Sequence, residues 1–235
     1  MKIKAVLFDL DGTLLPIDQD LFIKSYFKGI GEKLAGYGYD SEKIVHTIWT
    51  ATMAMIKNDG ATSNEELFWK TAQELGGTSR RDDEPYFNAF YKENFDALKS
   101  TCGYTPKAKQ VVDMLREKGC IVALATNPVF PRIATQKRMS WAGLDKSQFA
   151  LVTTYENCRY CKPNPAYYLD IVKKLDMQPT ECLMVGNDVR EDMIAQSLGM
   201  KVFLLTDCLI NRDGKDISVY PNGNFDDLIA FVKNI

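Results

Sequence analysis

Two aspartates follow a short apolar run near the start of the chain, in the segment Ala5-Val6-Leu7-Phe8-Asp9-Leu10-Asp11-Gly12-Thr13. The run has the composition of a buried strand, and open α/β sheets bind ligands at the carboxyl ends of their strands. Residues two apart in an extended segment point to the same side, so Asp9 and Asp11 can face one small volume. Two carboxylates this close repel unless a cation or a shared proton intervenes. The pair indicates a reactive site, and the alternative is an acidic turn at Asp11-Gly12.

Polar residues also occur at three later points of the chain, two of them directly after an apolar run and one directly before a helical pattern. They are Thr126 and Asn127 after residues 121–125, Lys162-Pro163 before a helical pattern, and Gly186-Asn187-Asp188 after residues 182–185, with Asp192 four positions on. Hydroxyl, ammonium and backbone N–H groups suit a phosphate, and clustered carboxylates without His or Cys suit Mg²⁺. Gathered at one sheet edge, these side chains predict metal-assisted phosphoryl chemistry.

The elements that would position these residues alternate between strand and helix. Strands are expected over residues 5–8, 121–125, 149–153, 182–185 and 202–205, and helices over 106–119, 132–141, 165–175, 190–198 and from 226 onward. Apolar strands that alternate with helices are typical of a parallel sheet covered on both faces. The predicted fold class is therefore α/β, with a Rossmann-like, doubly wound parallel sheet and a loop over residues 206–224.

An all-helical block interrupts this pattern directly after the acidic segment. Helices are expected over residues 18–38, 41–57, from Thr62 or Ser63 to Gly76-Gly77, and 84–98. Residues 1–15 and 105–235 are predicted to form the catalytic core, and residues 16–104 an inserted helical cap domain. An insertion at this point would lie over the carboxyl ends of the strands, which makes it a lid by position.

The order of these motifs resembles the haloacid dehalogenase superfamily, in its phosphatase branch. The matching segments are Asp9-Leu10-Asp11-Gly12-Thr13, Thr126-Asn127, Lys162-Pro163, and Gly186-Asn187-Asp188 with Asp192. The helical insertion after the first motif is similar to the cap of one subclass, that of the β-phosphoglucomutases and phosphoglycolate phosphatases.

The resemblance implies a role for each matching residue. Asp9 would be the nucleophile that takes the phosphoryl group, and Asp11 would protonate the leaving alcohol and then activate water. The implied Mg²⁺ ligands are Asp9, the backbone carbonyl of Asp11 and Asp188, with Asp192 in the outer shell. The implied phosphoryl-binding groups are Thr126, Asn127 and Lys162. Positive charge is also required physically, because a carboxylate and a phosphate dianion repel.

The expected activity is that of a Mg²⁺-dependent phosphatase, which hydrolyses a small phosphate ester through an aspartyl-phosphate. One alternative is a phosphomutase of the β-phosphoglucomutase type, which would keep the aspartyl-phosphate and return the phosphoryl group to a sugar. The other is a phosphoacceptor module without turnover. Asp11 argues against that module, because an acid–base group shortens the life of a signalling phosphate. Both a monomer and a homodimer are compatible with the sequence.

Composition argues against several other classes of protein. The 235 residues carry a net charge of −2, so no basic field attracts nucleic acid or an anionic membrane. No apolar run approaches the length of a membrane span, and the chain starts with a strand-like segment, so a cytoplasmic protein with its six cysteines as thiols is expected. Cys158 and Cys161 have the spacing of a zinc-ligand pair, but no second pair or histidine lies nearby, and no zinc site is predicted.

Overall fold

The computed structural model describes residues 2–76 and 79–235. Met1, which belongs to the predicted core, and Gly77, at the predicted end of the third helix of the insertion, lie outside the described residues.

A six-stranded sheet forms the centre of the fold, and every neighbouring pair of strands in it is parallel. Its strands are β1 (Ala5–Phe8), β2 (Ile121–Leu124), β3 (Leu151–Val152), β4 (Cys182–Gly186), β5 (Lys201–Leu205) and β6 (Asn222–Gly223). The strand order is β3-β2-β1-β4-β5-β6, which reverses direction between β1 and β4. Doubly wound sheets bind ligands at such a reversal, outside the carboxyl ends of the strands. The predicted α/β class is confirmed, and the aspartates after β1 lie at the reversal.

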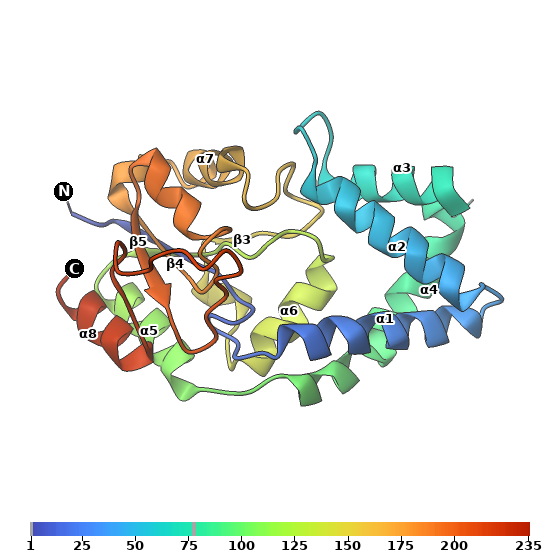
Figure 1. The fold of residues 1–235 in the computed structure, drawn as a ribbon, viewed down its shortest axis with the longest axis horizontal. Coiled ribbons are helices and arrows are strands. Elements are labelled where there is room, and N and C mark those ends of the chain that lie inside the picture. The colour runs from blue at the N-terminus through green and yellow to red at the C-terminus, as the bar shows by residue number, and fades with distance from the viewer. Residues whose placement is uncertain (1, 77–78) are drawn as a thin grey trace.

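Helices cover both faces of the sheet (Figure 1). The helices that follow β1 in the sheet region are α5 (Pro106–Glu117), α6 (Arg132–Trp141), α7 (Pro165–Lys174) and α8 (Phe225–Lys233), with 3₁₀ helices η2 (Lys146–Gln148), η3 (Pro179–Glu181) and η4 (Met193–Leu198). Side chains alternate along each strand, so Val6 and Phe8 pack in the core with α5 and α8, whereas Ala5 and Leu7 pack in the core with α7 and η4. All four are fully buried, which fixes the register of β1 and hence the position of Asp9.

The inserted block consists of helices between β1 and α5. They are α1 (Gln19–Ala35), α2 (Ser41–Ile56), α3 (Asn64–Gly76), α4 (Arg80–Glu93) and the 3₁₀ helix η1 (Phe95–Thr101), and Figure 1 shows them extending to one side of the sheet. Ile17 and Cys102 form an antiparallel bridge where the chain enters and leaves the block. The domain boundaries at residues 15/16 and 104/105 stay a prediction, which this pairing supports.

Local capping explains where several helices begin. Thr105 accepts the backbone N–H of Lys107 and is followed by proline at the first position of α5. Ser63, one of the two expected caps of α3, exchanges hydrogen bonds with Glu66: its hydroxyl accepts the Glu66 N–H, and the Glu66 carboxylate accepts the Ser63 N–H. This reciprocal pair is a capping box, and it fixes the start of α3.

Three elements differ from the sequence-based expectation. The predicted helix 84–98 is instead α4 followed by η1, and α4 begins earlier because Asp83 in its first turn accepts the Ser79 N–H. The predicted helix 190–198 is reduced to η4, since the Asp188 carboxylate accepts the N–H groups of the following turn and competes with helix formation. The predicted loop 206–224 contains β6, which pairs with the end of β5.

Candidate active site

A buried lysine connects two of the predicted site carboxylates. The Nζ atom of Lys162 lies 2.8 Å from Oδ1 of Asp9 and 2.7 Å from Oδ1 of Asp192. The side chains of Lys162 and Asp192 are only 1% exposed, and Asp9 as a residue is 7% exposed. Charged side chains are buried to this degree only when they are paired. The structure therefore brings together three residues that are up to 183 positions apart in the sequence, Asp9, Lys162 and Asp192.

The charges in this cluster are unbalanced, because two carboxylates surround one ammonium group. Burial raises the pKa of Asp9 to about 8, with Lys162 acting in the opposite direction and Asp192 adding to the rise. Burial alone would lower the pKa of Lys162, but Asp192 and Asp9 outweigh it and raise that pKa well above its usual value. Lys162 therefore remains a cation, and the cluster lacks positive charge whenever Asp9 and Asp192 are both ionised.

Asp188 and Asp192 lie in the turn that follows β4. The Asp192 N–H donates to the Asp188 carbonyl at 2.9 Å, and Oδ2 of Asp192 accepts the Asp188 N–H at 3.0 Å. The Oδ1 atom of Asp188 accepts the N–H groups of Arg190 and Glu191. Gly186 permits this arrangement, since a Cβ atom there would overlap the Asp192 carboxylate. Asp192 is thus positioned to orient Lys162, whereas Asp188 keeps its second carboxylate oxygen for another ligand.

Thr126 and Asn127 follow β2 as expected, next to the end of β1. Thr126 is buried, and its carbonyl accepts hydrogen bonds from the hydroxyls of Thr153 and Tyr167. The side chain of Asn127 is used within the protein: Oδ1 accepts the Lys162 N–H at 3.2 Å, and Nδ2 donates to Glu191 at 3.1 Å. Asn127 therefore holds the backbone at Lys162 in place.

Glu191 was not among the predicted site residues. Burial raises its pKa to about 7, opposed by Lys162 and reinforced by Asp192. It adds a half-buried carboxyl group to the site, held by the Asn127 amide, and its only sequence signal is its place next to Asp192.

In the loop after β1, Thr13 and Gly12 both lie against the side chain of Asn187. The Thr13 hydroxyl lies 3.0 Å from Oδ1 of Asn187 and 3.5 Å from Oδ2 of Asp9. Gly12 has a φ of +81°, and a Cβ atom there would overlap the Asn187 side-chain amide. Only glycine combines this backbone conformation with such a close approach. These contacts join the loop after β1 to the Gly186-Asn187-Asp188 segment that follows β4.

Asp11 forms an ion pair that the sequence did not suggest. Its Oδ2 atom accepts a hydrogen bond from Nη1 of Arg138, a fully buried side chain of α6. Its Oδ1 atom is buried and has no hydrogen-bond partner among the described residues. One oxygen of Asp11 is therefore fixed by Arg138, and the other is enclosed with its hydrogen-bonding capacity unused.

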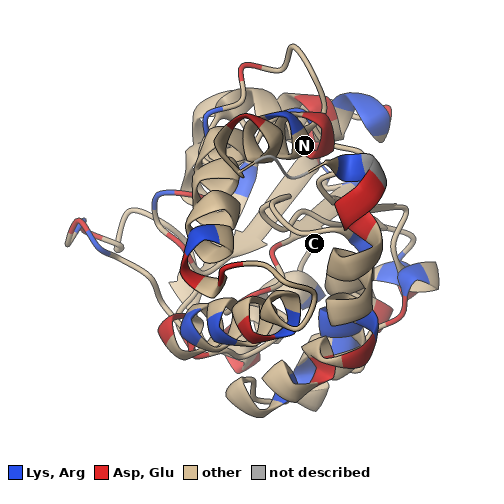
Figure 2. Ribbon diagram, turned by 90° about the vertical axis from the view of Figure 1, so that its right-hand side faces the viewer, with Lys and Arg blue, Asp and Glu red and all other residues tan. Residues whose placement is uncertain are grey.

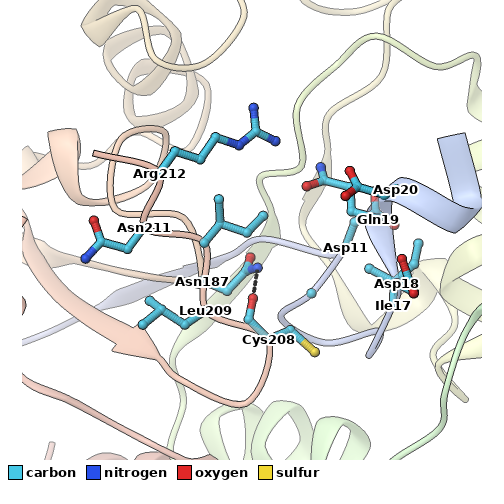
Figure 3. Close-up of a pocket in the computed structure, with 12 residues that line it drawn as sticks. Asp11, Ile17, Asp18, Gln19, Asp20, Asn187, Cys208, Leu209, Asn211 and Arg212 are labelled. Atoms are coloured by element: carbon cyan, nitrogen blue, oxygen red, sulfur yellow. Dashed lines mark hydrogen bonds between the residues drawn. The ribbon is translucent and has the colours of Figure 1, made fainter. Parts of the chain in front are cut away.

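A pocket of about 460 Å³ opens beside Asp11 (Figure 3). Its walls come from the loop after β1, the first turn of α1 and the loops after β4 and β5, and include Asp11, Gln19, Asp20, Asn187, Leu209 and Arg212. The Asn187 amide donates to the Cys208 carbonyl at 2.7 Å and holds the β5 loop against the site, as the dashed line in Figure 3 shows. The pocket is large enough for a small metabolite.

The donor atoms at this sheet edge suit a hard divalent cation. Among residues 2–76 and 79–235, no three acidic, histidine or cysteine side chains converge as a metal-binding group. Two carboxylates, Asp9 and Asp188, together with a backbone carbonyl remain as oxygen ligands, and Mg²⁺ accepts such partial protein coordination because it retains several waters. The unbalanced negative charge around Lys162 supports the same conclusion. The oxygen donors present therefore suit a divalent metal ion.

Cys158 and Cys161 are buried thiols in the loop that precedes Lys162. Burial raises the pKa of Cys158 to about 12 and raises that of Cys161 further. The Asn64 amide of α3 donates to the sulfur of Cys161 at 3.2 Å and to the Pro128 carbonyl at 3.1 Å. These cysteines thus belong to the contact between the inserted helices and the sheet region.

Two global properties bear on possible partners. None of the helices described is long and apolar enough to cross a membrane. On the face shown in Figure 2, basic and acidic residues are interspersed along the helices.

Comparison with known proteins agrees with this geometry. The family model of the haloacid dehalogenase-like hydrolases matches residues 3–197, which is most of the chain and includes all four motifs. The chain belongs to this family. It is 29% identical to the ribulose-1,5-bisphosphate 5-phosphatase of Halopiger xanaduensis over 85% of this chain and 83% of that protein. It is also 27% identical to a phosphoglycolate phosphatase of Haemophilus influenzae over 87% of this chain and 86% of that protein.

Among solved structures, a predicted phosphoglycolate phosphatase from Haemophilus somnus 129PT superposes with a TM-score of 0.60 and 22% identity, covering 99% of both chains. That likeness concerns the fold. With the family match and the phosphatase relatives, it places this hydrolase in the phosphatase branch of the family, as the sequence motifs predicted.

Proposed function

We propose that this haloacid dehalogenase-like hydrolase is a Mg²⁺-dependent phosphatase that cleaves a small phosphate monoester through an aspartyl-phosphate on Asp9. The observation that carries the proposal is the buried bridge from Lys162 to Asp9 and Asp192, placed at the reversal point of the sheet. A buried ammonium next to a buried carboxylate is the pairing needed to bring an anionic nucleophile to an anionic substrate.

In the first half-reaction, the free oxygen of Asp9 attacks phosphorus, and the bond from phosphorus to the leaving alcohol breaks. Lys162 stabilises the charge that develops on the phosphoryl oxygens, and the Thr126 hydroxyl is proposed to donate a hydrogen bond to them. Asp11, which lines the adjoining pocket, supplies a proton to the leaving oxygen. The products are an alcohol and a phosphorylated Asp9.

In the second half-reaction, Asp11 takes a proton from water, which attacks the same phosphorus from the vacated side. The bond from Asp9 to phosphorus breaks, and inorganic phosphate leaves. Asp192 keeps Lys162 oriented throughout. A Mg²⁺ ion held by Asp9, the Asp11 carbonyl and Asp188 would supply the remaining positive charge that this cluster lacks.

The pocket beside Asp11 is the proposed site of the leaving group, because Asp11 must reach the leaving oxygen. Its volume and its polar walls favour a small polar metabolite over a protein side chain. The substrates in the names of two relatives, ribulose 1,5-bisphosphate and phosphoglycolate, are small polar metabolites of this kind.

Phosphate release in the presence of Mg²⁺ tests the proposal. The panel comprises sugar phosphates, nucleoside monophosphates, phosphoglycolate and an aryl phosphate. We expect release by the wild type and loss of at least about a thousandfold in kcat for Asp9→Asn, because an amide is not a nucleophile here. Asp170→Asn, which removes a carboxylate from a surface pair on α7, is the matched control and should retain activity. Turnover by Asp9→Asn at the wild-type rate contradicts the mechanism, and an isomeric sugar phosphate in place of free phosphate indicates a mutase.

A further inference from the structure

Arg138 is a buried cation that the reaction sequence above does not use. It lies on α6, and its side chain is 1% exposed. Its short contact is with Oδ2 of Asp11, whereas its hydrogen bonds to the Ala134 carbonyl and the Thr135 hydroxyl are both 3.4 Å long. A guanidinium retains its proton in proteins, so this position always carries a positive charge. Asp11 is its counter-ion.

Aromatic side chains fix the plane of this guanidinium. Its central carbon lies 4.4 Å from the centroid of the Phe130 ring. Phe130 in turn packs edge-on against Tyr26 of α1, at 5.2 Å between ring centroids, and contacts Phe22 at 6.2 Å. Arg138 is therefore held at the contact between the sheet region and the inserted helices, and its planar fork cannot rotate freely.

This arrangement makes the two oxygens of Asp11 unequal. Oδ2 is occupied by Arg138, and Oδ1 is buried without a protein partner. Asp11 also lines the 460 Å³ pocket in which the leaving group is proposed to bind. Arg138 therefore holds the Asp11 carboxyl group in one orientation at the wall of this pocket. A carboxyl group with a fixed orientation is what efficient general acid catalysis requires.

We infer that Arg138 is the positioning residue for Asp11, and that it holds the Asp11 carboxyl group at the pocket wall for proton transfer to the leaving-group oxygen. The inference rests on the proposed role of Asp11 as the acid and base. As the bond from phosphorus to the leaving oxygen breaks, the proton moves from the Asp11 carboxyl group to that oxygen, and Asp11 becomes a carboxylate paired with Arg138. The attacking water later returns a proton to Asp11. Arg138 gains and loses no proton in either step.

The test uses leaving groups that differ in their need for a proton. Phenyl phosphate, para-nitrophenyl phosphate and dinitrophenyl phosphate release increasingly acidic phenols, and the last needs little help from an acid. We expect Arg138→Met to lower kcat/KM for phenyl phosphate by about 10- to 100-fold, but for dinitrophenyl phosphate by less than about threefold. The quantity kcat/KM is chosen because it reports the step in which the leaving group departs.

Three controls separate positioning from structural support. Arg132→Met removes an exposed arginine from the same helix and should leave all three substrates unaffected. Arg138→Lys keeps the charge without the planar fork, and should recover part of the loss while remaining dependent on the leaving group. In an Asp11→Asn background, Arg138→Met should cause no further decrease in kcat/KM, because its effect acts through Asp11.

An equal loss of kcat/KM for all three substrates overturns the inference, and so does an additive effect in the Asp11→Asn background. If Arg138→Met does not fold, the Arg138→Lys variant decides through its leaving-group dependence. Failure of the proposed function looks different, since the wild type would then release no phosphate from any of the three esters.

Discussion

Removing the Lys162 ammonium should destabilise the protein far more than removing a lysine from its surface. In Lys162→Met the side chain keeps its length but leaves Asp9 and Asp192 buried without their shared cation. Loss of one partner from a buried ion pair costs about 3–5 kcal/mol. A protein of this size loses about 2–4 °C of melting temperature per kcal/mol, which corresponds to a decrease of roughly 6–20 °C.

The assay is thermal unfolding in a chelating buffer, because a bound cation would offset the missing charge. Lys174→Met is the matched control: it removes the same group from a half-exposed pair with Asp170 on α7. Exposed pairs contribute about 0–1 kcal/mol, so the control should melt within roughly 4 °C of the wild type. Adding Mg²⁺ should restore part of the stability of Lys162→Met and little of its activity, since a cation replaces charge but not the ammonium that contacts the phosphoryl group.

If Lys162→Met melts at the same temperature as Lys174→Met in the chelating buffer, the charge balance inferred for the site is wrong. The ion pairs of Lys162 would then make no net contribution to stability, and Lys162 would contribute packing alone.

Two further predictions concern the cation and the loop after β1. Without metal, the melting temperature should fall by about 5–10 °C between pH 6 and pH 8, because burial raises the pKa of Asp9 to about 8 and the folded state then binds a proton that the unfolded state has already lost. Adding Mg²⁺ should abolish this decrease. EDTA should abolish turnover, and activity that survives thorough chelation contradicts the metal site. Gly12→Ala should destabilise the protein by about 2–4 kcal/mol, since it adds an overlap with Asn187 to the backbone strain at φ +81°. Gly214→Ala, at φ +61° with nothing within 4 Å, is the control and should cost only about 1 kcal/mol. Equal losses of unfolding free energy, measured by denaturant unfolding, would show that the Asn187 contact is unimportant.

The parts of the site that the sequence predicted are those whose signal is local. Asp9, Thr126 and Asp188 each follow an apolar strand within one to two residues, and parallel strands must end at the same sheet edge. The strands themselves were recognisable because they are buried on both faces and so carry continuous apolar runs. The exception is β6, two residues long, which exists through pairing with β5 and leaves no run of its own. The strand predicted over residues 149–153 is present as β3, but it is only two residues long.

The parts that were missed depend on contacts between distant segments. Arg138 and Asp11 are 127 positions apart, and nothing in the composition of α6 names Asp11 as the partner. A partial signal was present: Arg138 lies four positions after Ala134 and three after Thr135, on the buried face of the helix. A charged residue on an apolar helical face requires a buried counter-ion, so that spacing would have flagged Arg138 without identifying what it contacts.

The burial of Asp9 also bears on the choice between an enzyme and a phosphoacceptor. A phosphoacceptor that takes its phosphoryl group from another protein must expose its aspartate to a partner surface, whereas Asp9 is 7% exposed and is enclosed by Lys162 and Thr13. The pocket adjoins it through Asp11, and its walls from α1 and the β5 loop limit what enters to a small ester. The same residue, Asp11, lines that pocket and is the proposed proton donor to the leaving group. Substrate entry and proton transfer therefore share one path, which favours turnover of a diffusible phosphate ester over storage of a signalling phosphate.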